Sequence, residues 1–463
     1  MSARIRLHHR RGPDLLGRRM IALPNRERRG RILRLGLPIM GGMSTYTFLE
    51  LLDILFVGYL GTTALAAVGI SILVTFAYLA LFGGVTIAVQ APTARLVGAR
   101  ITEDRVRYLR TTLALVTGAA PLGALLLGYY AEEVLAFMSA DPALVAAGTP
   151  YLRWSVAAGV FLTLNNTFMG FWNATDRPGL YLRVVLLQAG IKIPLNGLLM
   201  FGWGPIPGYG AEGAGMALFG AALAGTAYHA IMAFRHADGW WRGSIAPHVS
   251  VVARLLGPAG AQQFLENLAL ALMFRIVAVV GTVEVAAYTV LVNFIGAVGL
   301  PAWALGMAGA TLVGQSLGAR DPTAAHRWAW DVVKVGSLAM MVLGIPFWAA
   351  PREVLSIFLH EREALELAVW PCRILGIMIG LNGIGYLFAS LLYGAGDVKR
   401  VLYVNLATQY GILLPGAWWV GIELGAGLLG IWMVHQFAFR AVNAVVLAAL
   451  WQQRRWARIE LMP

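Results

Sequence analysis

The chain contains two copies of one segment: residues 34–100 align without a gap onto residues 254–320. Both copies are long, apolar and interrupted by glycine and proline. The identical positions lie mainly where a helix begins, turns or ends, because backbone geometry restricts the choice of residue there. They include Pro38 and Pro258, Gly61 and Gly281, Ala67 and Ala287, and Arg100 and Arg320. Such a repeat is typical of membrane transporters.

The chain is too apolar for a water-soluble protein. Of its 463 residues, 59% are hydrophobic and 13% are charged, whereas roughly 25% of the residues in a soluble domain are charged. Its single cysteine excludes a disulfide framework and a cysteine-ligated metal cluster. The formal net charge of +13 is spread over short loops, which argues against a nucleic-acid partner. These features predict an all-α polytopic membrane protein.

Apolar stretches of about 20 residues predict the membrane-spanning helices. We expect twelve of them, near residues 35–60, 64–92, 107–130, 143–172, 179–203, 211–234, 253–281, 284–313, 331–350, 364–393, 400–422 and 427–452. With an even number of helices in each half, the halves are parallel repeats related by an axis along the membrane normal.

The distribution of basic residues predicts the topology. Arginine and lysine gather in the loops after even-numbered helices and are sparse after most odd-numbered ones, except in the mixed segment 351–366. By the positive-inside rule, both termini are expected in the cytoplasm. The expected division is a basic cytoplasmic tail at 1–33, an N-lobe at 34–235, a cytoplasmic linker at 236–252, a C-lobe at 253–452 and a cytoplasmic C-terminal tail at 453–463.

The first 34 residues hold eleven arginines and no apolar core, so they do not resemble a secretory signal peptide. We interpret them as a lipid-contacting tail. An organelle transit peptide, or a misplaced start codon with Met20 as the alternative start, would give a similar composition.

The sequence carries no motif of an enzyme or of an ATP-driven pump. None of its three lysines lies in a Walker A pattern, and His-Glu-x-x-His and Gly-x-Ser-x-Gly are both absent. We therefore expect no enzymatic activity, no cofactor and no metal site. The remaining functions are transport driven by an ion gradient, passive flipping and channel behaviour.

Four segments resemble the MATE (multidrug and toxic compound extrusion) transporters, with mixed NorM-like and DinF-like features. They are Asp53–Ala67, Gly210–Ala217, Leu312–Arg320 and Gly394–Asp397. The resemblance runs from about residue 34 to residue 450. It implies two six-helix lobes around a central cavity, alternating access, and export of organic, often cationic, compounds against inward H⁺ or Na⁺. We expect a monomer in the inner (plasma) membrane.

Two carboxyl groups lie inside the first predicted helix. Asp53 is eight residues before Gly61, and therefore about 12 Å below the outer end of its helix. Tyr46, Glu50 and Asp53 share one helix face. Because two carboxylates one turn apart ionise together only at high cost, one of them is expected to accept a proton. The alternative is that Asp53 only caps a structural network.

The fifth predicted helix carries a matching polar stripe, Gln188, Lys192 and Asn196. Lys192 lies about 15 Å from the outer end of this helix, a depth similar to that of Asp53. We predict a pair between Lys192 and either Asp53 or Glu50; the alternative is a snorkelling or neutral lysine. One MATE branch has Asn at the position of Lys192, and its DinF-like members have Asp at the position of Asn196. A resident ammonium group favours H⁺ over Na⁺ as the coupling ion.

The second half has one acidic residue at mid-membrane depth, Glu266. It resembles an acid of the NorM-like branch, whereas Asn382 stands where that branch has a second acid. Glu266 could bind a cationic substrate, couple a proton or accept hydrogen bonds from Asn267. Arg275 is expected to snorkel outward, and Arg440 to belong to cytoplasmic-side structure. The residues predicted to line the substrate cavity are Glu266, Asn382, Tyr46, Asn267 and Asn293.

The sequence thus predicts a secondary active antiporter that exports cationic or amphipathic organic compounds in exchange for H⁺. One alternative is a Na⁺-coupled MATE exporter. The other is a flippase of lipid-linked intermediates from the same broad superfamily, which would need a wide cationic cavity. Lys192, Arg275 and Arg440 are too scattered in the sequence to favour such a cavity.

Overall fold

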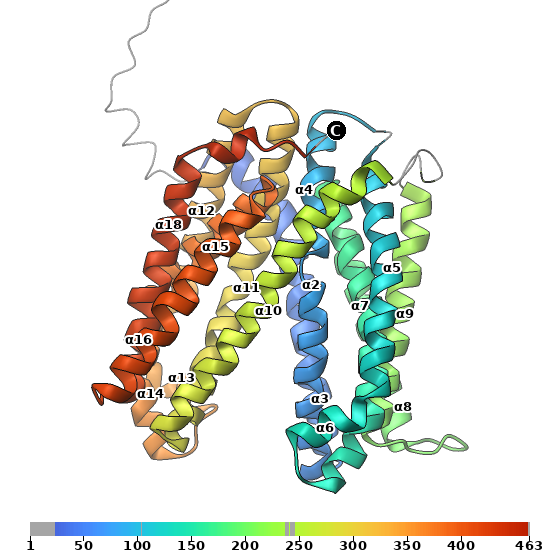
Figure 1. Ribbon diagram of the computed structural model, residues 1–463, viewed down its shortest axis with the longest axis vertical. Helices are drawn as coiled ribbons and strands as arrows, with labels where there is room; N and C mark the ends of the chain where they lie inside the picture. Colours follow the sequence, from blue (N-terminus) through green and yellow to red (C-terminus); the bar gives the residue numbers. More distant parts are fainter. Residues whose placement is uncertain (1–23, 103, 237–239, 241–245, 462–463) are drawn as a thin grey trace, which may run out of the picture.

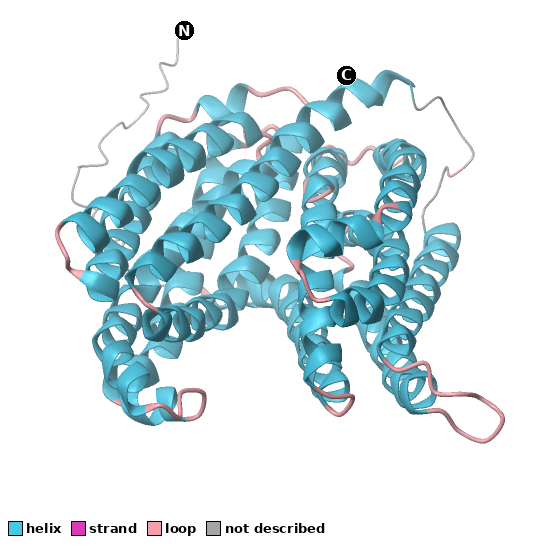
Figure 2. Ribbon diagram, turned by 60° about the horizontal axis from the view of Figure 1, so that its bottom comes forward, coloured by secondary structure: helices cyan, strands magenta, loops and turns pink. Residues whose placement is uncertain are grey.

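The computed structural model describes residues 24–102, 104–236, 240 and 246–461. Within these ranges every regular element is a helix, apart from an isolated bridge between Trp203 and Ile206 (Figure 2). Ten of the described helical spans are long and apolar enough to cross a membrane. The all-α class predicted from the sequence is therefore confirmed.

The described helices of the first half of the chain all lie before residue 237. Its helices are α2 (Arg26–Gly58), α3 (Thr62–Leu81), α4 (Val85–Gly98), α5 (Arg105–Tyr129), α6 (Ala131–Met138), α7 (Pro142–Ala174), α8 (Pro178–Phe201) and α9 (Ala211–His236).

The second half begins with α10 and contains three π-helices (η1, η2 and η3) and a final 3-10 helix (η4). Its elements are α10 (Ala246–Val280), α11 (Thr282–Gly318), α12 (Pro322–Ala349), α13 (Pro351–Ser356), α14 (Arg362–Gly394), α15 (Val398–Thr408), η1 (Gln409–Leu413), α16 (Leu414–Trp418), η2 (Trp419–Glu423), α17 (Gly427–Met433), η3 (Val434–Ala441), α18 (Val442–Gln452) and η4 (Arg455–Arg458).

The 220-residue spacing of the sequence repeat also governs the helix bounds. The pair α7 and α14 have the same length, 33 residues, and start at 142 and 362. The helix α11 starts 220 residues after α3 starts and ends 220 residues after α4 ends. The turns repeat as well, since Arg100 and Arg320 both adopt a left-handed backbone, with φ of 60° and 57°. The relation between the halves therefore extends beyond the aligned segments.

Several helix bounds differ from those expected. The helix α2 starts at Arg26 rather than near residue 35, because the Asn25 side chain caps it by accepting a hydrogen bond from the Arg28 amide at 3.0 Å. The helix α10 likewise starts at Ala246. The second predicted helix is interrupted between α3 and α4 at Gly84, where an added Cβ would lie 2.6 Å from the Leu256 carbonyl oxygen of α10. Close packing against α10 thus accounts for a glycine at this break.

Two of the twelve predicted spans are not among the ten apolar ones. The run from α15 to η2 covers the expected span 400–422, but it alternates between α- and π-helix, so no single helix in it is long enough. The helix α7 is long enough, and its sequence contains polar residues such as Asn165, Asn166 and Asn173.

The two halves approach each other at the end of the bundle where α2 begins and η4 ends, which we call the terminal face (Figure 1). From there the helices of the two halves spread apart toward the end where α3 and α11 begin (Figure 1). The first and last described helices both reach the terminal face (Figures 1 and 2).

Reciprocal glycine contacts join α4 and α11 near the terminal face. A Cβ added to Gly98 would lie 1.8 Å from the Gln315 carbonyl oxygen, and one added to Gly318 would lie 1.9 Å from that of Arg95. Gly98 and Gly318 are equivalent positions of the repeat, and so are Arg95 and Gln315. The two contacts are therefore related by the pseudo-two-fold symmetry of the repeat, and both require a residue without a side chain.

The side chains of Arg95 and Gln315 also cross between the halves. Arg95 donates to the Ala395 carbonyl at the end of α14, at 2.8 Å, and to the Ile459 carbonyl of the C-terminal segment. Gln315 donates to the Ala174 carbonyl at the end of α7, at 3.2 Å. Each residue thus satisfies a carbonyl at the C-terminal end of a helix in the opposite half.

The two ends of the described chain add further contacts between the halves. In the first turn of α2, Arg28 pairs with Asp331 of α12 at 2.7 Å and lies 4.1 Å above the Trp328 ring. At the other end of the chain, Tyr108 of α5 donates to the Leu461 carbonyl at 2.7 Å. Each half therefore holds a terminal segment of the other at the terminal face.

Candidate functional site

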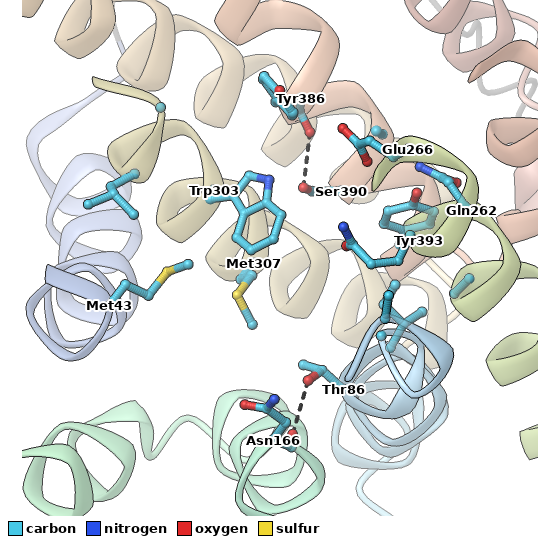
Figure 3. A pocket seen from close by; sticks show the side chains of 18 of the residues that line it. Met43, Thr86, Asn166, Gln262, Glu266, Trp303, Met307, Tyr386, Ser390 and Tyr393 are labelled. Atoms are coloured by element: carbon cyan, nitrogen blue, oxygen red, sulfur yellow. Dashed lines mark hydrogen bonds between the residues drawn. The ribbon is translucent and has the colours of Figure 1, made fainter. Parts of the chain in front are cut away.

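A cavity of about 740 Å³ lies between the two halves. Helices α2, α3, α4, α7 and α8 line it from the first half, and α10, α11, α14, α15, η1, η3 and α18 from the second. Figure 3 shows Gln262, Glu266, Tyr386 and Tyr393 on one side of it and Thr86 and Asn166 on another. Its size and its mixture of aromatic, amide and apolar side chains suit a drug-sized organic molecule.

Only two of the described residues that line the cavity are charged, Glu266 of α10 and Arg440 of η3. The Arg440 guanidinium lies 4.9 Å above the Tyr386 ring and 5.1 Å from the Phe439 ring. Glu266 and Arg440 are close enough to interact electrostatically, but the described part of the chain contains no direct ion pair between them. The cavity thus contains an acidic and a basic group that do not neutralise each other by contact.

A second polar cluster lies between α2 and α8. The Lys192 ammonium forms an ion pair and hydrogen bond with Oδ2 of Asp53, and the Asn196 amide donates to Oδ1 of Asp53 at 2.7 Å. The pair of Lys192 with Asp53 that the two helix depths predicted is therefore present. Lys192 is 5% exposed and Asn196 is 1% exposed, so the whole carboxylate is held by buried donors.

Glu50 lies one turn from Asp53 on α2 and is partly buried. It is within electrostatic range of both Asp53 and Lys192. No hydrogen-bond partner for its carboxyl occurs among the described residues. Glu50 is therefore the carboxyl of this cluster that remains available to bind a proton.

The residues expected to form the site fall into three groups. Those that line the cavity are Tyr46, Gln188, Glu266, Asn267 and Asn382. The residues Asp53, Glu50, Lys192 and Asn196 form the separate cluster between α2 and α8 and do not line the cavity. Asn293 lies exposed on α11 and is not part of the lining.

Asn382 is buried and donates to Oε1 of Gln436 at 2.6 Å. This hydrogen bond joins Asn382 of α14 to η3. Where the NorM-like branch has an acid, this chain places a neutral amide that is already hydrogen-bonded.

Arg440 and Asn443, which were expected in cytoplasmic-side structure and not in the substrate site, both line the cavity. Arg440 is thirteen residues after the start of α17 and twelve before the end of α18. Counting from the helix ends would have placed it at mid-membrane depth, where an ionised side chain is rare and usually functional. The side of the helix on which it lies depends on the π-helix η3, which no sequence pattern marks.

The chain is similar to known transporter proteins over most of its length. A model of the MatE family matches residues 38–198 and 258–419. A probable multidrug resistance protein NorM from Rhizobium meliloti is 25% identical, with 92% of each chain covered. One from Caulobacter vibrioides is 27% identical, with 86% of each chain covered. A FAD transporter from Shewanella oneidensis is 25% identical, with 83% of this chain and 86% of the relative covered.

Solved structures show the same fold. An outward-facing multidrug resistance MATE transporter of the MOP superfamily superposes with a TM-score of 0.86 at 18% identity, covering 95% of this chain and 98% of the other. A MOP superfamily transporter from Pyrococcus furiosus, described as having a binding pocket of reverse polarity, gives 0.85 at 19% identity, covering 94% and 96%.

Proposed function

Because this chain belongs to the MatE family of transporters, and is therefore a multi-pass, non-enzymatic membrane protein, we propose that it exports organic compounds in exchange for inward H⁺. The relatives named as multidrug resistance proteins support an efflux role. The observation on which the choice of H⁺ rests is the occupied carboxylate of Asp53, both oxygens of which already accept hydrogen bonds.

H⁺ suits this cluster better than Na⁺ because few carboxylate oxygens are free to coordinate a metal ion. Na⁺ is a hard cation that prefers several free oxygen ligands. Lys192 and Asn196 already occupy Asp53, and Asn382 places an amide where a second acid would be needed. A proton needs only one carboxyl group, and Glu50 lies unpaired beside Asp53. Protonation of Glu50 would remove one of the two negative charges of α2 that attract Lys192, and would so weaken the electrostatic attraction between α2 and α8.

The proposed architecture has twelve membrane spans, obtained by adding α7 and the α15–η2 run to the ten apolar spans. They would form two six-helix lobes, at 34–235 and 253–452, around the central cavity. The segments 1–33, 236–252 and 453–463 would be cytoplasmic, in a monomer of the inner membrane. The arginines at the terminal face, among them Arg95, Arg100 and Arg320, support the cytoplasmic assignment of that face.

With the terminal face in the cytoplasm, the structure corresponds to an outward-facing state. The contacts of Gly98, Gly318 and their partners would close the cytoplasmic side, while the opposite ends of the halves spread apart (Figure 1). Alternating access would then require these contacts to separate.

A lipid-linked-intermediate flippase is the less favoured alternative. Its pyrophosphate would call for several cationic side chains in one cavity. Arg440 is the only basic side chain among the described lining residues, since Lys192 and Arg275 lie elsewhere.

The test is dye efflux from proteoliposomes under an imposed pH gradient in nominally Na⁺-free buffer. We expect wild-type efflux to follow the pH gradient. Glu50→Gln, which removes the proton-accepting carboxyl and leaves the ion pair of Asp53 with Lys192 in place, should abolish the coupled component. Glu133→Gln, which changes an exposed carboxyl on α6, is the matched control and should leave efflux unchanged. Efflux that needs millimolar Na⁺ and ignores the pH gradient would contradict H⁺ coupling.

A further inference from the structure

Among the described residues that line the cavity, Arg440 is the one arginine, and it lies near the middle of the helical run from α17 to α18. Arg440 belongs to η3, twelve residues from the end of α18 and thus about 18 Å from it along the helix axis. A charged side chain at this depth is costly unless it is paired, hydrated or used in function. The π-helix also indicates a functional role for Arg440, since π-helical turns often occur at functional sites.

Arg440 has no acceptor in the described part of the chain. Its Nε is buried without a hydrogen-bond partner, and its guanidinium makes no ion pair with a described residue. Its contacts are the rings of Tyr386 and Phe439. These rings position the planar guanidinium but leave its N–H donors free.

The amide N–H donors of Asn443 and Asn382, two polar residues of the same wall, are already engaged. Asn443, one turn further along, donates to Oδ1 of Asn405 at 2.8 Å and to Oγ1 of Thr408 at 3.0 Å. Asn382 donates to Gln436. The guanidinium is therefore the strong donor that this wall of the cavity offers to an incoming molecule.

The acidic group of the cavity is Glu266. It lines the same cavity as Tyr386, the ring above which the Arg440 guanidinium lies (Figure 3). Glu266 and Arg440 interact electrostatically without touching. A molecule between them would meet opposite charges on its two sides, with an aromatic surface between.

We propose that Arg440 binds an oxyanion of the substrate and, together with Glu266, selects amphoteric compounds that carry both a carboxylate and a basic nitrogen. A guanidinium matches a carboxylate with two parallel hydrogen bonds. Glu266 disfavours a simple anion, and Arg440 disfavours a simple cation, because like charges in contact are repulsive. This substrate class deepens the proposed export function and rests on it.

Two dyes with one aromatic core test the proposal. Rhodamine 110 carries a free carboxylic acid, and rhodamine 123 is its methyl ester. Binding to the full chain in lipid nanodiscs is followed by fluorescence polarisation. We expect wild type to bind rhodamine 110 roughly 10-fold more tightly than rhodamine 123, as one charge-assisted pair allows. Arg440→Gln should weaken rhodamine 110 binding by about the same factor, whereas binding of the cationic rhodamine 123 should stay the same or become tighter because a like charge is removed.

The matched control is Arg275→Gln, which removes an exposed arginine of α10 outside the lining. It should leave both affinities unchanged. Arg440→Lys keeps the charge without the planar fork and should retain part of the preference, which also serves if Arg440→Gln does not fold. Equal binding of the dyes by wild type, or an equal loss of both in Arg440→Gln, overturns the proposal.

Transport of the same dyes in proteoliposomes separates this inference from the proposed function. A preference for rhodamine 110 in binding without transport of either dye would refute export and leave the role of Arg440 standing. Export of both dyes with equal apparent affinity would refute the role of Arg440 and leave export standing.

Discussion

Replacing Gly98 by alanine should part the two halves at the terminal face. The added methyl carbon would lie 1.8 Å from the Gln315 carbonyl oxygen and 2.6 Å from its carbon, whereas real Cβ contacts essentially never fall below 3.0 Å. Both atoms belong to the backbone of a long helix, so α4 and α11 must separate. The repulsion acts only where the two helices meet, and so it selects against the state described here.

The size of the shift follows from the cost of overpacking. Inserting a methyl group into a closely packed contact costs about 1–3 kcal/mol. That cost corresponds to a roughly 5- to 150-fold change in the population ratio of two conformations, one with the halves in contact at the terminal face and one with the halves separated there. Gly318→Ala should act in the same way, since its Cβ would lie 1.9 Å from the Arg95 carbonyl oxygen. The double variant should shift the ratio by less than the product of the two single effects, because helices already parted by one methyl accommodate the second.

The assay is pulsed electron spin resonance between spin labels at Ile101 and Thr323, exposed sites in different halves at the terminal face. The single cysteine, buried Cys372, is first replaced so that labelling is specific. Gly118→Ala is the control, because a Cβ at this helical glycine would meet nothing within 4 Å. An unchanged distance distribution in Gly98→Ala, or an equal shift in Gly118→Ala, would refute the reasoning.

Two further predictions concern the buried ion pair and the C-terminal segment. Asp53→Asn and Lys192→Met should each lower the free energy of unfolding by about 3–5 kcal/mol, because each leaves a buried group without its partner. The double variant should lose less unfolding free energy than the sum of the two single losses. Thermal unfolding of the four proteins measures this double-mutant cycle, and strict additivity would show that the two residues are not coupled. Truncation after Arg454 removes the two carbonyl acceptors of the C-terminal segment to which Arg95 and Tyr108 donate. The distance between spin labels at Ile101 and Thr323 should then lengthen, and Tm should fall. An unchanged distance would mean that this segment does not hold the halves together.

The features that could be predicted from the sequence depend on distance along one helix. The depth of Asp53 and Lys192 below their helix ends placed them at one level, and the structure pairs them. Tyr46 was expected in the cavity and lines it, whereas Gln188 was expected beside Lys192 and Asn196 as part of the ion-coupling cluster and lines the cavity instead. Residue spacing within a regular helix fixes height and facing direction, so these inferences needed no tertiary information.

The features that could not be predicted depend on irregular helices or on contacts between the halves. The direction of Arg440 follows from η3, whose wider turn changes the angular position of each side chain. Asn293 was expected in the cavity, but α11 leaves it exposed. The early start of α2 is supported by Asp331 and Trp328, which lie some 300 residues away in the sequence. No local pattern encodes such partners.

The reciprocal contact of α4 and α11 bears on how the chain evolved. A constant spacing between two copies indicates duplication and fusion of a shorter gene, and in a symmetric dimer of that ancestor one substitution would have altered both contacts at once. In a single fused chain each contact can change separately. The glycines of the two contacts have stayed the same, but their neighbours have diverged, since Arg95 now reaches the C-terminal segment and Gln315 reaches the side chain of Asp176. The two copies could thus specialise, one toward anchoring the end of the chain and the other toward the end of α7.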